Sequence, residues 1–169
     1  MIDPQRRAAH QKERRRVPRG GRRITDQDGR HPLVLVADSY EGARTPLARY
    51  LDHFHFSAKE AGDRDQALST IAEAIPAVIL IETDFPDLFP WRLSGYLSAH
   101  GRTRAIPIIV MVSTGARPSY ATGGFRPRAV LVKPFSLAAM LRDIRRVLHV
   151  SNQDGQQNGK QNPSAFRHD

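Results

Sequence analysis

Polar side chains follow the apolar stretches of this sequence at several points. Glu82 comes directly after the apolar residues of "AVILIE", and Lys133 ends "RAVLVK" in the same way. The full set is Asp38, Glu82, Asp84, Ser113 with Thr114, and Lys133. Carboxylates, hydroxyls and an ammonium pair with one another and bind ions. Whether they form one site depends on the elements that carry them.

Short apolar stretches and helical patterns alternate along the middle of the chain. The stretches predict strands over residues 32–38, 54–61, 77–82, 106–113 and 128–134. Amphipathic patterns predict helices over residues 44–54, 63–74, 91–99 and 136–150. This alternation favours an α/β fold with a doubly wound, five-stranded parallel sheet covered on both faces. Ligands bind such folds at the carboxyl ends of the strands, so the polar residues would gather on one rim.

Residue types at the helix starts indicate where three of the helices begin. Thr45 is expected to cap the first helix, with Pro46 at its first helical position. Asp63 should cap the second helix, and Ser136 the last one.

The composition excludes several classes of protein. Cysteine is absent from the 169 residues, which excludes disulfides, thiolate metal sites and a cysteine nucleophile. The apolar runs are far shorter than the roughly 18 residues that span a bilayer. The N-terminal arginines precede no apolar core, so a secretory pattern is also missing. We expect a soluble, cytoplasmic protein with no membrane partner.

The net charge of +9 is concentrated near the N-terminus. Residues 1–31 hold ten Lys and Arg against four Asp and Glu, and they have no sustained apolar period. Residues 150–169 are rich in Gln, Asn and Gly and are equally aperiodic. Such segments bury too little apolar surface to offset their chain entropy. We therefore expect a disordered Arg-rich tail over 1–31, one folded domain over 32–149 and a disordered polar tail over 150–169.

Four motifs within residues 32–149 resemble those of the receiver domains of bacterial response regulators, which act with histidine kinases in two-component and phosphorelay signalling. They are "LVLVADS", "AGDRDQAL", "ILIETDFP", and "IPIIVMVS" followed by "VLVKPFS". The resemblance implies the flavodoxin-like receiver fold. It also implies that Lys133 and Pro134, joined by a cis peptide bond, end the fifth strand and place the ammonium in a phosphate pocket.

The same resemblance assigns a phosphoryl acceptor and a metal site, and this sequence departs from both. Glu82 stands at the position of the family's acceptor aspartate, four residues before Pro86. Of the two acids that hold Mg²⁺ after the first strand only Asp38 remains, because Ala37 replaces the other. Asp84 is at the position where the family's backbone carbonyl binds the metal, and its side chain should border the pocket without acting.

Two further positions of the family's pattern have changed. Val112 stands where the family has a phosphate-binding hydroxyl, with Ser113 and Thr114 one and two residues later. Val130 replaces the usual switch aromatic. A degenerate pocket of this kind should bind Mg²⁺ weakly or not at all, with Asp38 and Glu82 as the only ligands. We expect Glu82 to pair with Lys133 about as a phosphoryl group would, and the protein to work without phosphorylation.

The resulting hypothesis is a stand-alone receiver-like module that is not an enzyme and acts through protein–protein contacts. Its partner would be a histidine kinase or another signalling protein, and a homodimer through the family's fifth helix is also compatible with the resemblance. A second hypothesis is a nucleic-acid-associated protein that binds nonspecifically through residues 1–31, with the α/β domain as scaffold. A third hypothesis is a phosphate-handling enzyme of the same fold. The sequence "ADSYEGAR" after the first strand argues against it, because it is not a Gly-rich phosphate loop.

Overall fold

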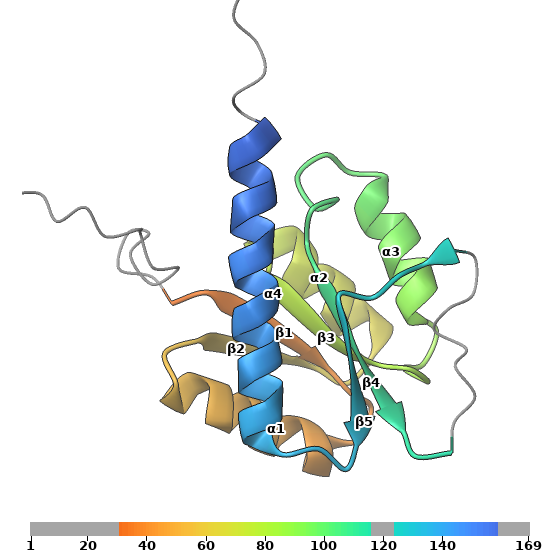
Figure 1. The fold of residues 1–169 in the computed structure, drawn as a ribbon. Coiled ribbons are helices and arrows are strands. Elements are labelled where there is room, and N and C mark those ends of the chain that lie inside the picture. Colours follow the sequence, from red (N-terminus) through yellow and green to blue (C-terminus); the bar gives the residue numbers. More distant parts are fainter. Residues whose placement is uncertain (1–30, 116–123, 159–169) are drawn as a thin grey trace, which may run out of the picture.

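A parallel five-stranded sheet forms the centre of the molecule, with strand order β2-β1-β3-β4-β5 (Figure 1). The computed structural model describes residues 31–115 and 124–158. Its strands are β1 (Leu33–Ala37), β2 (Ser57–Ala61), β3 (Val78–Glu82), β4 (Ile108–Ser113) and β5 (Ala129–Lys133). Its helices are α1 (Glu41–His53), α2 (Arg64–Ala74), α3 (Pro90–Ser98) and α4 (Leu137–Asn158). The predicted doubly wound, flavodoxin-like receiver fold is therefore confirmed.

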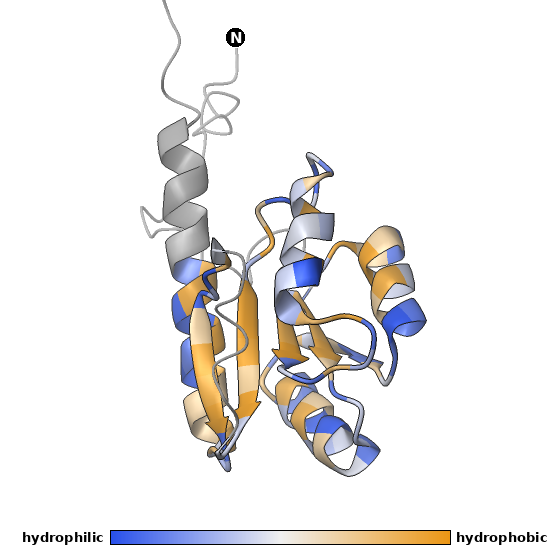
Figure 2. Ribbon diagram, turned by 90° about the vertical axis from the view of Figure 1, so that its right-hand side faces the viewer, coloured by the Kyte–Doolittle hydropathy of each residue, from blue (hydrophilic) through white to orange (hydrophobic). Residues whose placement is uncertain are grey.

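The three central strands are buried on both faces because helices cover both sides of the sheet. In β1, Val34 and Val36 face one core with α1 and α4, while Leu35 and Ala37 face a second core with α2 and α3. Figure 2 shows the strands as largely apolar ribbons between helices with hydrophilic outer sides. Burial on both faces explains why these strands are continuously apolar in sequence and do not alternate.

The first helix begins earlier than its sequence predicts. α1 starts at Glu41 with Tyr40 as its N-cap, so the predicted capping role of Thr45 is wrong. The hydroxyl of Thr45 instead donates to Glu60 Oε2 at 2.9 Å. Pro46 lies inside the helix and not at its first position, and its missing N–H removes one helical hydrogen bond there. The helix therefore includes residues 41–43, whose turn-like sequence did not indicate a helix.

The second strand starts later than predicted, at Ser57 in place of residue 54. The chain is still leaving α1 at this point, since the Phe54 N–H donates to the Leu51 carbonyl at 3.0 Å. His55 then takes a left-handed φ of 63°, which ends the helix in the way that a C-terminal cap does.

The last helix confirms its predicted start and corrects its predicted end. The Ser136 hydroxyl accepts from the Ala139 N–H at 3.1 Å, as a cap should. α4 then runs to Asn158, so residues 150–158, which were predicted to belong to the disordered polar tail, are helical. Helix propagation costs little once the apolar half of a helix is packed, which explains the extension into polar sequence. The predicted disorder of residues 1–30 and 159–169 lies outside the described residues.

Within the described residues, no helix combines the length and the apolar character needed to cross a bilayer.

The predicted cap of α2 is present and offers a test of the fold. The Asp63 side chain accepts from the Gln66 N–H at 2.9 Å. We expect Asp63→Ala to lower the free energy of unfolding by about 1 kcal/mol, because a first-turn amide loses its acceptor. Asp63→Asn keeps a capping oxygen and should stay close to the wild type in urea unfolding. Equal losses in both variants would show that the cap does not stabilise α2.

Candidate functional site

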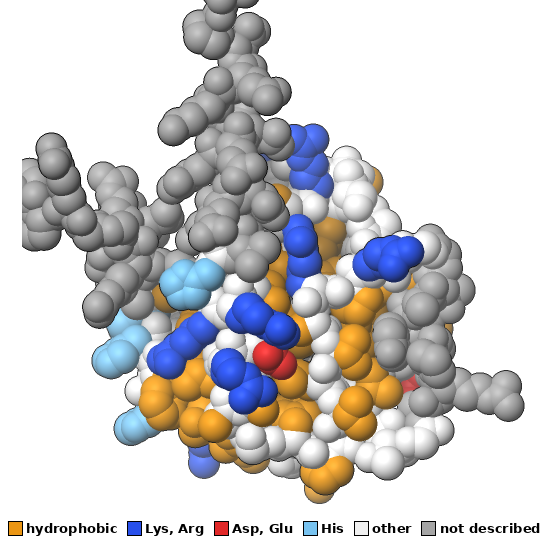
Figure 3. All heavy atoms as spheres, in the orientation of Figure 1, with side chains coloured by type: hydrophobic (Ala, Val, Ile, Leu, Met, Phe, Trp, Pro, Cys, Tyr) orange, Lys and Arg blue, Asp and Glu red, His pale blue; other side chains and the backbone are white. Residues whose placement is uncertain are grey.

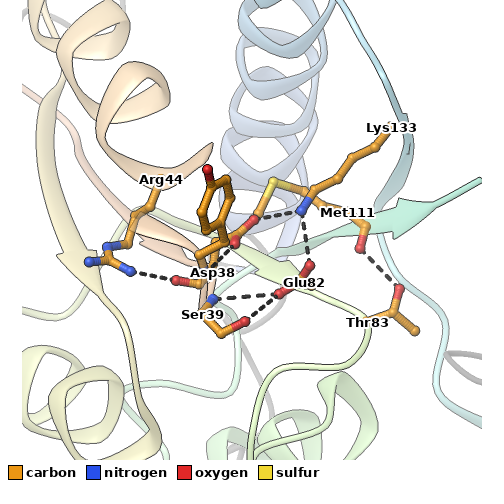
Figure 4. A network of polar contacts seen from close by, with 8 residues as sticks. Asp38, Ser39, Arg44, Glu82, Thr83, Met111 and Lys133 are labelled. Carbon is orange, nitrogen blue, oxygen red and sulfur yellow. Dashed lines mark hydrogen bonds and ion pairs between the residues drawn. The ribbon is translucent and has the colours of Figure 1, made fainter. Parts of the chain in front are cut away.

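Three charged side chains meet at the carboxyl ends of the strands (Figure 4). Asp38 follows β1, Glu82 ends β3 and Lys133 ends β5. The Lys133 ammonium lies 2.6 Å from Asp38 Oδ2 and 3.0 Å from Glu82 Oε1. β4 lies between β3 and β5 in the sheet, so the lysine side chain reaches across the end of a whole strand. We call these three residues the carboxylate–lysine cluster.

Asp38 is the most deeply buried member of the cluster. It is fully inaccessible to solvent, and its Oδ1 accepts from the Tyr40 N–H at 2.9 Å. A buried carboxylate is stable only when it is paired and hydrogen-bonded. Asp38 meets this condition with Lys133 on one oxygen and a backbone amide on the other.

The turn after β1 is held by two side chains that the sequence did not point to. Arg44 donates from Nη1 to the Asp38 carbonyl at 2.7 Å and pairs through Nε with Glu60 at 3.0 Å. Ser39 donates its hydroxyl to Glu82 Oε2 at 3.1 Å. Their positions, directly after Asp38 and in the first turns of α1, were the available signal. These contacts fix the loop that carries Asp38.

Glu82 has both carboxylate oxygens engaged, because Oε1 accepts from Lys133 and Oε2 accepts from Ser39. Its side chain remains 16% exposed, so this acid lies at the mouth of the site while Asp38 lies at its base. The predicted proximity of Glu82 and Lys133 is therefore present in the structure.

Lys133 is positioned by its backbone as well as by its charge. The Lys133–Pro134 peptide bond is cis. The Thr114 hydroxyl donates to the Lys133 carbonyl. Thr114 therefore orients the end of β5 through its backbone, and within the described residues its hydroxyl makes no hydrogen bond to the two carboxylates.

The surroundings of Lys133 also shift its pKa. Burial lowers the pKa of the ammonium, but the hydrogen bonds and negative charges of Asp38 and Glu82 outweigh burial and raise it above its ordinary value of 10.5. The lysine is therefore positively charged at neutral pH, and the cluster carries two negative charges against one positive charge.

Two of the predicted site residues stay outside the cluster. Asp84 and Ser113 are exposed, and in the described part of the chain neither side chain has a hydrogen bond or ion pair to the side chains of the cluster, although Ser113 pairs with Lys133 in the β4–β5 ladder. A hydroxyl that the sequence did not single out is more deeply placed. Thr83 is buried and donates to the Met111 carbonyl at 2.9 Å, which ties the loop after β3 to β4.

The receiver resemblance implies Mg²⁺, and the donors present do not fit this ion. Mg²⁺ needs near-octahedral oxygen ligands, with carboxylates among them. Ala37 is buried and brings no carboxylate, and all four oxygens of Asp38 and Glu82 accept hydrogen bonds from the protein. Within the described residues, no group of three or more His, Cys, Asp or Glu could hold a metal. The ammonium of Lys133 supplies the positive charge that lies between the two acids.

Comparison with known proteins finds likeness at the level of structure. No protein-family model matches the chain, and no curated protein does. The chemotaxis response regulator CheY4 of Vibrio cholerae is similar with a TM-score of 0.62 and 21% identity, over 69% of this chain and 98% of that one. A putative response regulator from Chloroflexus aurantiacus gives 0.63 and 20%, over 71% and 98%.

A response regulator receiver domain protein from Clostridium thermocellum is also similar, with a TM-score of 0.61 and 15% identity over 72% of this chain and 98% of that one. These likenesses show that the chain has the fold of response-regulator receiver domains. At such identities they show the fold alone, so the roles of the cluster residues stay predictions.

The cluster generates a stability prediction. We expect Lys133→Met to lower the free energy of unfolding by about 3 kcal/mol at pH 7, because it leaves the buried charge of Asp38 without its partner. Lys59→Met makes the same chemical change at an exposed position of β2 and should have little effect. Urea unfolding measures both. Similar losses in the two variants would contradict a special role of Lys133.

The raised pKa of Lys133 gives the same prediction a pH dependence. Between the unfolded value of 10.5 and the higher folded value, the native protein binds more protons than the unfolded chain. The stabilisation is therefore complete below pH 10.5 and is lost as the pH rises through the folded value. The difference between wild type and Lys133→Met should shrink over that alkaline window. A constant difference would mean that charge is not the source of the effect.

Proposed function

We propose that this chain is a receiver-like module of a bacterial two-component or phosphorelay system that works without phosphorylation and acts through protein–protein contacts. The observation that carries the proposal is the Lys133 ammonium bound between Asp38 and Glu82, at 2.6 and 3.0 Å. In the family that the sequence resembles, this lysine binds the phosphoryl group. Here its hydrogen bonds go to two carboxylates of the chain itself.

The length of the Glu82 side chain supports this function. Glutamate carries its carboxylate one methylene further than aspartate does, and Oε1 reaches the ammonium while Oε2 reaches Ser39. The carboxylate thus reaches Lys133, as a phosphoryl group carried by an acceptor aspartate would. A permanent negative group at this place would hold the chain in one signalling state.

The charges and geometry also argue against Glu82 as an acceptor and against enzymatic activity at this site. Phosphoryl transfer depends on positioning and on neutralising the charge of the transferred group. Both oxygens of Glu82 are occupied, and the donors do not fit the metal that would neutralise that charge. A nucleophile displaced by about 1 Å can lose on the order of 10²-fold in rate.

A surface for the partner lies next to the cluster, on β5. This strand is at the edge of the sheet, and Leu131 packs into the core with α4. The alternate residues Val130 and Val132 are 37% and 56% exposed, and Val132 precedes Lys133 directly. Edge strands with exposed apolar side chains are common sites of protein association. The cluster would then fix the partner-binding strand from its carboxyl end.

Exposed arginines of α4 add positive charge on the other side of β5 from Val130 and Val132. Figure 3 shows Lys and Arg side chains gathered around one acidic side chain on the side of the molecule where α4 lies. Arg142, Arg145 and Arg146 are exposed on this helix, and Asp143 lies 3.9 and 3.1 Å from the first and the last. An acidic surface on a histidine kinase, on another signalling protein or on a second copy would be complementary to it.

The acceptor prediction separates a fixed module from a working receiver. We expect no Mg²⁺-dependent change in the fluorescence of Trp91, the single tryptophan, when beryllofluoride is added. Glu82→Asp alone should also show no Mg²⁺-dependent fluorescence change, because Ala37 still leaves the metal short of a ligand. Ala37→Asp with Glu82→Asp should recover Mg²⁺-dependent acyl-phosphate formation. Ala37 is buried, so circular dichroism must first establish that the double variant folds.

Phosphorylation of the unmodified protein would contradict this proposal directly. The decisive observation would be a phosphate-dependent gel shift that disappears in Glu82→Gln, since that variant keeps the shape of the side chain and loses the nucleophile.

A nucleic-acid-associated protein is the second candidate function, and the charge of residues 1–31 favours it. Ten basic residues against four acidic ones can neutralise phosphates and release counterions. If this segment binds duplex, the affinity should fall steeply with salt, with a slope near −0.9 per neutralised phosphate.

Deletion of residues 1–31 should then abolish binding and leave the thermal midpoint unchanged, because the described core begins after it. Filter binding at several salt concentrations measures the slope. Equal binding by the shortened protein would reject the segment as the cause, and no binding of the full chain at low salt would reject this function.

A further inference from the structure

A second polar site lies away from the carboxylate–lysine cluster, between α2 and α3. It is a pocket of about 350 Å³ lined by Arg64, Leu68, Asp87, Leu88, Arg92 and Tyr96. The residues come from α2, from the loop after β3 and from α3. None of them belongs to the cluster or to the surface on β5. The volume is near the lower end for small-molecule sites, so the pocket has room for one small organic molecule.

Two guanidinium groups give the pocket its charge. Neither Arg64 nor Arg92 forms an ion pair within the described residues, although Asp87 lines the same pocket. The Arg92 guanidinium lies 5.0 Å from the ring centroid of Trp91 and 5.9 Å from that of Phe89. Aromatic faces hold the cation in place without using its N–H donors. The pocket therefore presents two arginines against one carboxylate, which favours an anion.

The remaining wall is apolar and partly aromatic. Leu88 is buried with 4% of its surface exposed, and Leu68 packs at the edge of the same core. Tyr96 is 38% exposed, and its ring packs beside that of His100 at 5.1 Å. An exposed tyrosine ring beside two leucines is a surface on which a flat apolar body can lie.

We propose that this pocket binds a small aromatic anion, that is, one aromatic ring carrying a phosphate or a carboxylate. Arg64 and Arg92 would hold the anionic group, for which the planar guanidinium is suited. The ring would lie against Tyr96, Leu68 and Leu88. Asp87 would accept a hydrogen bond from a hydroxyl or amino substituent. This inference is independent of the proposed signalling function, since it uses no residue of the cluster.

Three probes test the anion site and the ring site separately. They are phenyl phosphate, inorganic phosphate and phenol. The readouts are the fluorescence of Trp91, which contacts Arg92, and the amide shifts of the ¹⁵N-labelled full chain. We expect saturable binding of phenyl phosphate with shifts in residues 64–68 and 87–96. Inorganic phosphate should bind about tenfold more weakly because it lacks the ring, and phenol should not saturate because it lacks the charge.

Variants then assign the contacts. Arg64→Gln and Arg92→Gln should each weaken phenyl phosphate at least about tenfold, since each removes a charge-assisted hydrogen bond. Tyr96→Ala should weaken phenyl phosphate but not inorganic phosphate. Arg49→Gln is the matched control, because Arg49 is an exposed arginine of α1 on the opposite face of the sheet, and its variant should bind normally. All of these positions are on the surface, and circular dichroism checks their folding.

Several results would overturn the proposal. They are the absence of saturable phenyl phosphate binding, equal affinity for inorganic phosphate, equal loss in Arg49→Gln, and amide shifts centred on residues 38, 82 and 133. The last result would place the anion at the carboxylate–lysine cluster.

Discussion

The burial of the Asp38 carboxylate is the constraint on which the rest of the site depends. A carboxylate with no solvent contact must find a counter-charge inside the protein. The charge comes from Lys133 at the end of β5, which is separated from β1 in the sheet by β3 and β4. That reach ties β1 to β5, and the second contact with Glu82 adds β3. One side chain therefore joins the ends of three strands. Its two ion pairs also hold the starts of the loops that follow β1 and β3.

The number of charges decides which cation such a site can accept. Asp38 and Glu82 carry two negative charges, and Lys133 returns one, so the cluster has a net charge of −1. An aspartate at position 37 would make it −2, which a divalent ion could neutralise. With Ala37 in that place the net charge is only −1, so a divalent ion bound beside Lys133 would bring one positive charge too many, and it would also have to lose part of its hydration shell. The alanine at position 37 thus leaves two carboxylates and one ammonium at the ends of β1, β3 and β5, joined as an ion-paired cluster.

The sequence was most informative where one physical rule dominates. Parallel strands end on the same edge of a sheet, so the sequence alone predicts that Asp38, Glu82 and Lys133 lie together. Hydrogen-bond partners depend on side-chain direction, and for that reason the contact of Ser39 with Glu82 was not predicted. The ends of helices were also hard to predict. Thr45, for example, is a residue type that often caps helices, but it lies within α1. The pocket between α2 and α3 combines three elements whose spacing no local pattern reveals.

The loop between β3 and α3 connects the two sites. It leaves the cluster at Glu82, and its next residue, Thr83, is bound to the Met111 carbonyl through both its N–H and its hydroxyl at 2.9 Å. Phe85 is fully buried, and Leu88, with 4% of its surface exposed, forms part of the pocket wall. Three buried side chains, those of Thr83, Phe85 and Leu88, hold this loop against the core and restrict its movement. The Leu88 wall of the pocket is therefore fixed by the core, while the charged groups at its mouth are exposed side chains.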